Sequence, residues 1–255
     1  MCTVIILLRP GHPWPVLIAA NRDELPSRPS TPPGRHWTDR PGVTAGMDDL
    51  SGGTWLGLND DGLFACVLNR VGTLGSAAGK RSRGELPLEA LDHAEAREAY
   101  EALRHLDTRA YRGFNLVIAD AQGAYWLSGD GDGAPTRGGV IGDGLHMITA
   151  HGLDDLESAR IRRHLPRFRA SPAPDVEAGD WFAWETLLAS TDAEPGATES
   201  GAMLIGDGSG FGTVSASLVA LPASAMPAKR PIFRHAPGRP GEVAFGPVEA
   251  VASKA

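Results

Sequence analysis

The chain has 255 residues, which is enough to bury a large hydrophobic core in one or two domains. Hydrophobic residues make up 42% and charged residues 22%, a globular composition that excludes wholesale disorder. The net charge of −7 comes without a basic stripe, which argues against nucleic-acid binding. Two cysteines are too few for a disulfide scaffold or a cysteine-based zinc site, and the eight histidines show no close pairing, so we expect no metal.

The apolar start of the chain is too short for a leader peptide or a membrane span. Residues 3–8 are apolar, but Arg9, Pro10 and Gly11 end the run. No other stretch approaches the ~20 apolar residues that a membrane helix needs. We therefore expect a cytoplasmic protein with free thiols, while the oligomeric state stays open.

The first third of the chain predicts two β-hairpins. Residues 3–8 and 16–20 are apolar runs separated by a turn, and residues 54–58 and 63–68 flank a second turn. The continuous hydrophobicity of the first pair indicates strands covered on both faces. Residues 25–43 contain five prolines and little periodicity, so we expect a loop there.

Helices and further strands follow. Apolar spacing predicts a continuous helix over residues 86–106 and two more over 153–169 and 181–189. The basic run of residues 160–164 indicates one face of the second helix, which acidic residues offset elsewhere. Strands are predicted over residues 114–119, 124–127, 140–141, 146–149 and 211–221, with a closing pair within 232–251. Hairpins outnumber crossover units, which favours two antiparallel sheets packed between helical layers in a single domain, residues 1–255.

Cys2 is the sharpest candidate for chemistry. Removal of Met1, which we expect, would place an α-amino group beside the thiol. Such an amine titrates near ~7.7–8.0 and can act as a general base for the adjacent nucleophile. The alternative is that Cys2 is a small apolar residue at the start of a strand.

Four consecutive polar residues, Asn21-Arg22-Asp23-Glu24, end the second apolar run. Pairing of the first two strands would bring this segment beside Cys2. Asp23 would then hold the α-ammonium or the thiol, and Arg22 would bind a carboxylate or stabilise a developing negative charge. The alternative is an exposed strand end with an internal ion pair.

Short motifs along the chain resemble the NRDE family, which includes the Transport and Golgi organization 2 proteins. In chain order they are Met1-Cys2-Thr3, Ala20 to Glu24, Trp55 to Asn59 with Gly62, Ser82-Arg83-Gly84, Gly113 to Leu116, and Phe211-Gly212-Thr213. This family is similar in turn to the cysteine amidases that include penicillin V acylases and bile salt hydrolases.

The resemblance implies the α+β class and the four-layer αββα fold of N-terminal-nucleophile (Ntn) hydrolases. It implies Cys2 as the nucleophile, with further catalytic roles for Asp23, Arg22 and Asn69, the last as an oxyanion donor. The candidate substrate-binding residues are Asn21, Glu24, Asn115 and His151. The chain departs from the amidases at Ala20, where they have arginine, and at Ala150, where they have asparagine. It departs from many NRDE proteins at Val214, where they have arginine.

The residues point to the first of two functions of different classes, and the family resemblance implies the second. The first is an amidohydrolase or acyl-transfer enzyme that cleaves a nonpeptide C–N bond of a small molecule through a cysteinyl intermediate, without a cofactor. The second is a noncatalytic NRDE-family binding or trafficking protein for haem, lipid or acyl-CoA. No Cys-Pro dipeptide of the haem-binding type is present.

Overall fold

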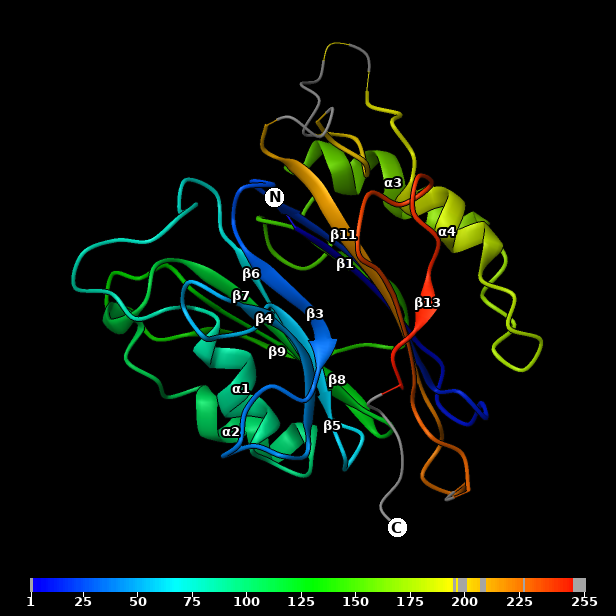
Figure 1. Ribbon diagram of the computed structural model, residues 1–255, viewed down its shortest axis with the longest axis horizontal. Helices are drawn as coiled ribbons and strands as arrows, with labels where there is room; N and C mark the ends of the chain where they lie inside the picture. Colours follow the sequence, from blue (N-terminus) through cyan, green and yellow to red (C-terminus); the bar gives the residue numbers. More distant parts are fainter. Residues whose placement is uncertain (1, 195, 197–200, 207–209, 227, 250–255) are drawn as a thin grey trace.

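Two antiparallel β-sheets lie face to face between two pairs of helices in the computed structural model (Figure 1). The structure describes residues 2–194, 196, 201–206, 210–226 and 228–249. No helix within these residues is long and apolar enough to cross a membrane.

The elements have the following bounds. One sheet contains β1 (Thr3–Leu8), β2 (Val16–Glu24), β10 (Gly144–Ile148), β11 (Gly212–Leu221), β12 (Ile232–Ala236) and β13 (Gly246–Pro247). The other contains β3 (Ser30–Gly34), β4 (Val43–Asp48), β5 (Leu56–Asn59), β6 (Phe64–Asn69), β7 (Phe114–Asp120), β8 (Gly123–Gly129) and β9 (Arg137–Ile141). The helices are α1 (Glu85–Leu91), α2 (Ala96–Leu103), α3 (Ala159–Ala170) and α4 (Phe182–Leu188), with a 3-10 turn at Thr108–Ala110.

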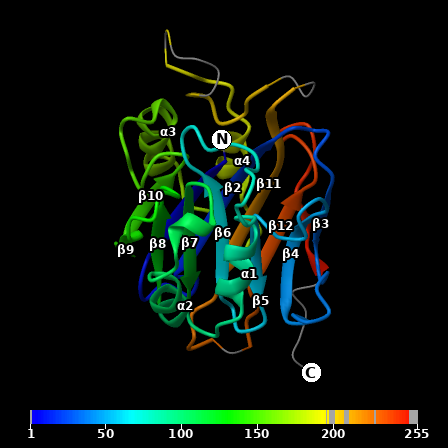
Figure 2. The same cartoon turned by 90° about the vertical axis from the view of Figure 1, so that its left-hand side faces the viewer.

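The first sheet has the strand order β10-β1-β2-β11-β12-β13, and the second runs from β3 to β9 in chain order. Figure 2 looks onto the face of the second sheet that α1 and α2 cover. Helices α3 and α4 pack on the outer face of the first sheet. The resulting four layers confirm the predicted α+β arrangement.

Successive residues of β1 and β2 are buried in different layers. Val4 and Ile18 belong to the apolar cluster between the sheets, whereas Ile5 and Leu17 pack against α3 and α4. This alternation follows from the pleat of a strand, whose neighbouring side chains point to opposite faces. It explains why these strands are continuously apolar, because each buried aliphatic side chain contributes roughly 1.5–3 kcal/mol.

The first hairpin fixes the position of the chain start. In the antiparallel pairing of β1 with β2, Thr3 lies opposite Asn21. The residue before β1 therefore lies beside the last residues of β2, as the sequence predicted.

The prediction of one continuous helix over residues 86–106 is wrong, because α1 and α2 are separate helices. The side-chain amide of Asn59 donates to the carbonyl of Leu91 at 3.0 Å, at the end of α1. The carboxylate of Asp120 accepts from the backbone N–H of Ala96 at 2.8 Å, at the start of α2. These distant residues satisfy backbone groups at the break that a continuous helix would have satisfied internally.

Other parts of the predicted secondary structure also differ from the observed elements. Helix α3 begins at Ala159 rather than 153, because the Ser158 hydroxyl caps it by accepting from the N–H of Ile161 at 3.3 Å. The loop predicted over residues 25–43 contains β3. As an edge strand, β3 tolerates the prolines that suggested a loop. Residues 250 and 251 of the predicted closing pair lie outside the described residues.

Candidate active site

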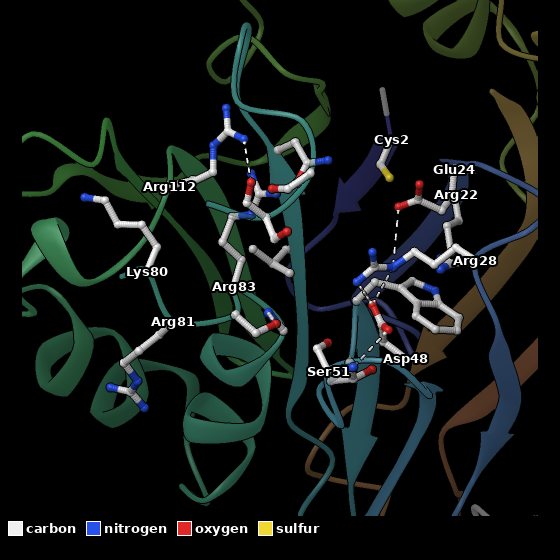
Figure 3. A pocket seen from close by; sticks show the side chains of 18 of the residues that line it. Cys2, Arg22, Glu24, Arg28, Asp48, Ser51, Lys80, Arg81, Arg83 and Arg112 are labelled. Atoms are coloured by element: carbon white, nitrogen blue, oxygen red, sulfur yellow. Dashed lines mark hydrogen bonds and ion pairs between the residues drawn. The ribbon is translucent and has the colours of Figure 1, made fainter. Parts of the chain in front are cut away.

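Cys2 lies at the wall of a cavity of about 310 Å³ (Figure 3). Its side chain is half-buried. The thiol packs at the margin of the apolar cluster between the sheets, and Sγ lies 3.7 Å from the backbone carbonyl oxygen of Asp23. The other cysteine, Cys66, is buried in β6.

The cavity brings several of the predicted site residues together. Arg22, Asp23 and Glu24 from the end of β2 line it, as does Asn69, the last residue of β6. Loops after β2, β4 and β6 supply much of the remaining wall, including Arg28, Trp55, Lys80 and Arg83. The site thus combines a thiol, a side-chain amide and several cations.

Arg22 lies against Trp55, with its guanidinium carbon 4.2 Å from the ring centroid. Its Nη1 donates to the Ser30 hydroxyl at 3.2 Å, and the residue is 8% exposed. Stacking on an indole face is a favourable environment for a guanidinium. The sequence predicted Arg22 as a site residue but did not predict that its guanidinium would stack on Trp55.

The carboxylate of Asp23 is bound on the α3 side of the first sheet rather than at the thiol. It accepts from Arg160 Nη1 at 2.9 Å and from the Thr213 hydroxyl at 2.8 Å. Arg160 Nη1 also donates to the Thr3 hydroxyl at 2.5 Å. The side chains of Arg160 and Asp23 are 2% and 0% exposed. The printed contact of Asp23 with the thiol is made by its backbone carbonyl oxygen. A role of Asp23 at the α-amino group stays a prediction.

The surroundings of the thiol oppose its ionisation. Burial, followed by the negative charge of Asp23, raises the pKa of Cys2, while the positive charge of Arg22 acts in the other direction. Since the thiolate is the reactive form, Cys2 needs a base to act as a nucleophile near neutral pH.

The side-chain amide nitrogen of Asn21 is bound inside the fold, and its role in substrate binding stays a prediction. Its side-chain amide nitrogen donates to the backbone carbonyls of Leu188 at 3.0 Å and Met203 at 2.9 Å. It therefore faces the helical layer, like Asp23. Glu24 does line the Cys2 cavity, where its carboxylate lies 3.9 Å from Arg28.

Asn115 and His151 do not line the cavity that contains Cys2. The amide nitrogen of Asn115 donates to the carbonyls of Thr149 and His151 at 2.9 and 2.7 Å. Its amide oxygen accepts from Arg70 and Trp126. The polar groups of Asn115 are thus committed to the protein, and we place neither residue in the proposed site.

The sequence pattern did not reveal the role of Arg160, because the basic run of residues 160–164 indicated one face of a helix. A signal was nevertheless present in the spacing. The buried residues of α3 are Arg160, Ile161, His164, Leu165 and Phe168. Arg160 therefore shares the apolar stripe of its helix, where an arginine calls for a buried counterion.

Solved structures of two amide hydrolases resemble this chain. The Caenorhabditis elegans ortholog of N-acylethanolamine-hydrolyzing acid amidase matches with a TM-score of 0.51 over 88% of this chain and 95% of that chain. A variant of conjugated bile acid hydrolase from Clostridium perfringens matches with a TM-score of 0.55 over 97% and 92%. Both are 12% identical in sequence, so the likeness shows the fold, which is that of an Ntn hydrolase.

The chain belongs to the Transport and Golgi organisation 2 family, whose model matches residues 1–177. It is 32% identical over 128 residues to the human Transport and Golgi organization protein 2 homolog, and 31% identical over 128 residues to the Bos taurus homolog. Each match covers 47% of this chain and 45% of the relative, so the aligned region spans less than half of these relatives.

Proposed function

We propose that this protein is an Ntn-type cysteine amidohydrolase or acyl transferase acting on a nonpeptide C–N bond of a small molecule in the cytoplasm. The observation that supports this best is the position of Cys2 at the wall of a cavity that Asn69 and Arg22 also line. The fold is shared with amide hydrolases. One further solved structure with this fold, at a TM-score of 0.52, is a mutant of conjugated bile acid hydrolase in which cysteine 2 of that enzyme is replaced by alanine.

In the proposed reaction, the α-amine released by removal of Met1 takes the thiol proton, and Sγ of Cys2 attacks the amide carbonyl carbon. Asn69 donates a hydrogen bond to the developing oxyanion, and Arg22 stabilises its charge. The C–N bond then breaks, the leaving nitrogen takes the proton from the ammonium group, and a thioester remains on Cys2. Water hydrolyses this thioester to a carboxylic acid, and an amine in place of water completes acyl transfer.

Asp23 is a positioning residue in this proposal. Arg160 contacts both Asp23 and Thr3, so one buried cation joins the end of β2 to the start of β1. Cys2 directly precedes Thr3, and its thiol contacts the Asp23 carbonyl. The ion pair therefore supports the segment that carries the nucleophile.

The proposal is tested with a panel of acyl amides that includes N-acylethanolamines. Intact-mass analysis of the wild type should show loss of Met1 and an acyl adduct that maps to Cys2, with release of the free amine. Cys2→Ala should abolish both signals, and the matched control Cys66→Ala should keep them. Absence of adduct and amine across the panel, in protein that has lost Met1, would reject the enzyme.

A noncatalytic binding or trafficking role for haem, lipid or acyl-CoA is the second candidate. The observation that favours it is the cavity of about 430 Å³ whose wall includes Leu25, Val214 and Val243, because apolar surface suits a lipid or haem ligand. Under this alternative, Cys2→Ala would bind haem or a fluorescent acyl-CoA with the Kd of the wild type, and the wild type would form no acyl adduct.

A further inference from the structure

Arg22 and Arg28 both line the cavity of the Cys2 thiol, but their electrostatic surroundings differ (Figure 3). Arg28 forms an ion pair with Asp48 at 2.6 Å. Arg22 has no carboxylate oxygen within the 4.0 Å of an ion pair in the part of the chain that the structure describes. Its polar contact there is with the neutral Ser30 hydroxyl.

The lack of a counterion matters because Arg22 is more than nine-tenths buried, at 8% exposure. Burial lowers the pKa of Arg22, which reflects the unfavourable removal of its charge from water. A charge buried without a partner is destabilising, and such sites are normally paired. An anionic group of a ligand would supply the missing partner.

The charges on the rest of the cavity wall are also mainly positive. Arg83 lines it, and burial, with repulsion from Arg112, lowers the pKa of Arg83 to about 10. Arg83 donates to the backbone carbonyls of Thr73 and Gly75 rather than to a carboxylate. The described lining has six cationic residues against three carboxylates, Asp23, Glu24 and Asp48. The carboxylate of Asp23 faces Arg160, so the surplus at the cavity is positive.

Arg22 also lies at the junction of two cavities. With Trp55 it lines a second cavity of about 430 Å³. Apolar residues of that second cavity include Leu25, Pro26, Val214, Pro237 and Val243. A ligand that pairs with Arg22 therefore lies next to both the apolar surface of the second cavity and the cavity of the Cys2 thiol.

We propose that the substrate of Cys2 carries an anionic group, a carboxylate, sulfonate or phosphate, that pairs with Arg22. This inference rests on the proposed function, because it names the substrate class of the same site. The planar guanidinium matches such oxygen pairs geometrically. A neutral substrate would occupy the cavity and leave the buried charge unpaired.

Two alkylating agents of nearly equal size test the anion preference without turnover. Iodoacetate is anionic and iodoacetamide is neutral, and the ratio of their rates at Cys2 is measured by peptide mapping. We expect the ratio to be about tenfold higher in the folded wild type than in the unfolded chain. Arg22→Gln should abolish that preference, and Arg22→Lys should retain it.

Arg35→Gln is the matched control, because it removes one positive charge from an exposed pair with Asp60, outside this cavity. It should leave the ratio unchanged. An equal ratio in wild type and Arg22→Gln overturns the inference. If Arg22→Gln does not fold, a competition experiment on the wild-type protein tests the inference instead. Acetate and inorganic phosphate should slow the labelling of Cys2 by iodoacetamide, whereas neutral acetamide should not. Equal effects of all three overturn the inference.

A matched pair of amides separates this inference from the proposed function. An N-acylglycine carries a carboxylate, and the corresponding N-acylglycinamide does not. Faster Cys2 acylation by the N-acylglycine supports both proposals, whereas equal acylation supports the enzyme and overturns the anion preference. No acylation by either amide, with an Arg22-dependent iodoacetate preference, counts against the enzyme and supports the anion site.

Discussion

At the scale of single residues, the two thiols provide an internal comparison. Cys2 is half-buried beside a cavity, whereas Cys66 is fully buried and its burial raises the pKa of its thiol. After removal of Met1, we expect iodoacetamide to label Cys2 about tenfold faster or more. The denatured chain is the control, in which Cys66 is exposed and the difference between the two labelling rates should shrink. Peptide mapping that finds Cys66 labelled at the same rate in the folded protein would refute this expectation.

The buried ion pair between Asp23 and Arg160 allows a second prediction at this scale, about the free energy of unfolding. Asp23→Asn preserves the shape of the side chain but removes the carboxylate from a buried arginine at 2.9 Å. Breaking one partner of a buried pair typically lowers stability by about 3–5 kcal/mol, and we expect that range for Asp23→Asn and for Arg160→Met. The double variant should recover part of the loss, because no unmatched charge is then created. Urea unfolding measures all three, and a wild-type midpoint for either single variant would contradict the prediction.

At the scale of elements, the break between α1 and α2 is bound by Asn59, a residue of the distant strand β5. Its amide nitrogen donates to the carbonyls of Leu91 and His93, at 3.0 and 2.7 Å. Asn59→Ala leaves these groups without that donor, and we expect a loss of about 1–3 kcal/mol in unfolding free energy. Gln122→Ala, which removes an exposed side-chain amide, is the control and should be neutral. Equal stability of the two variants would show that the break does not depend on Asn59.

Elements set by local pattern were predictable from sequence, and those set by distant partners were not. The apolar runs predicted β1, β2, β5 and β6 because both faces of these strands are covered. The α1–α2 break depends on Asn59 and Asp120, which lie in other elements. In the site, the hairpin register predicted that Cys2 and Arg22 would lie together. The direction of the Asp23 carboxylate depends on Arg160, 137 residues away, which no local pattern encodes.

At the scale of the whole molecule, the first sheet includes strands that lie beyond the region matched by the family model. The family model ends at residue 177, but β11, which pairs along β2 from Val16 to Glu24, follows that point. A chain of residues 1–177 would expose this edge of β2 and lose the α4 side chains that cover the sheet. We expect the truncated chain to be insoluble or unfolded, and the full chain to melt cooperatively. A soluble 1–177 fragment with a cooperative thermal transition would disprove this.

The alternation of β2 has a consequence for how variation at its end is interpreted. Asn21 and Asp23 hold the helical layer, whereas Arg22 and Glu24 line the cavity. The four consecutive residues are therefore two interleaved pairs with different structural surroundings. Alleles at the odd positions should reduce the amount of protein in a cell, whereas alleles at the even positions should spare the amount and alter what the protein does.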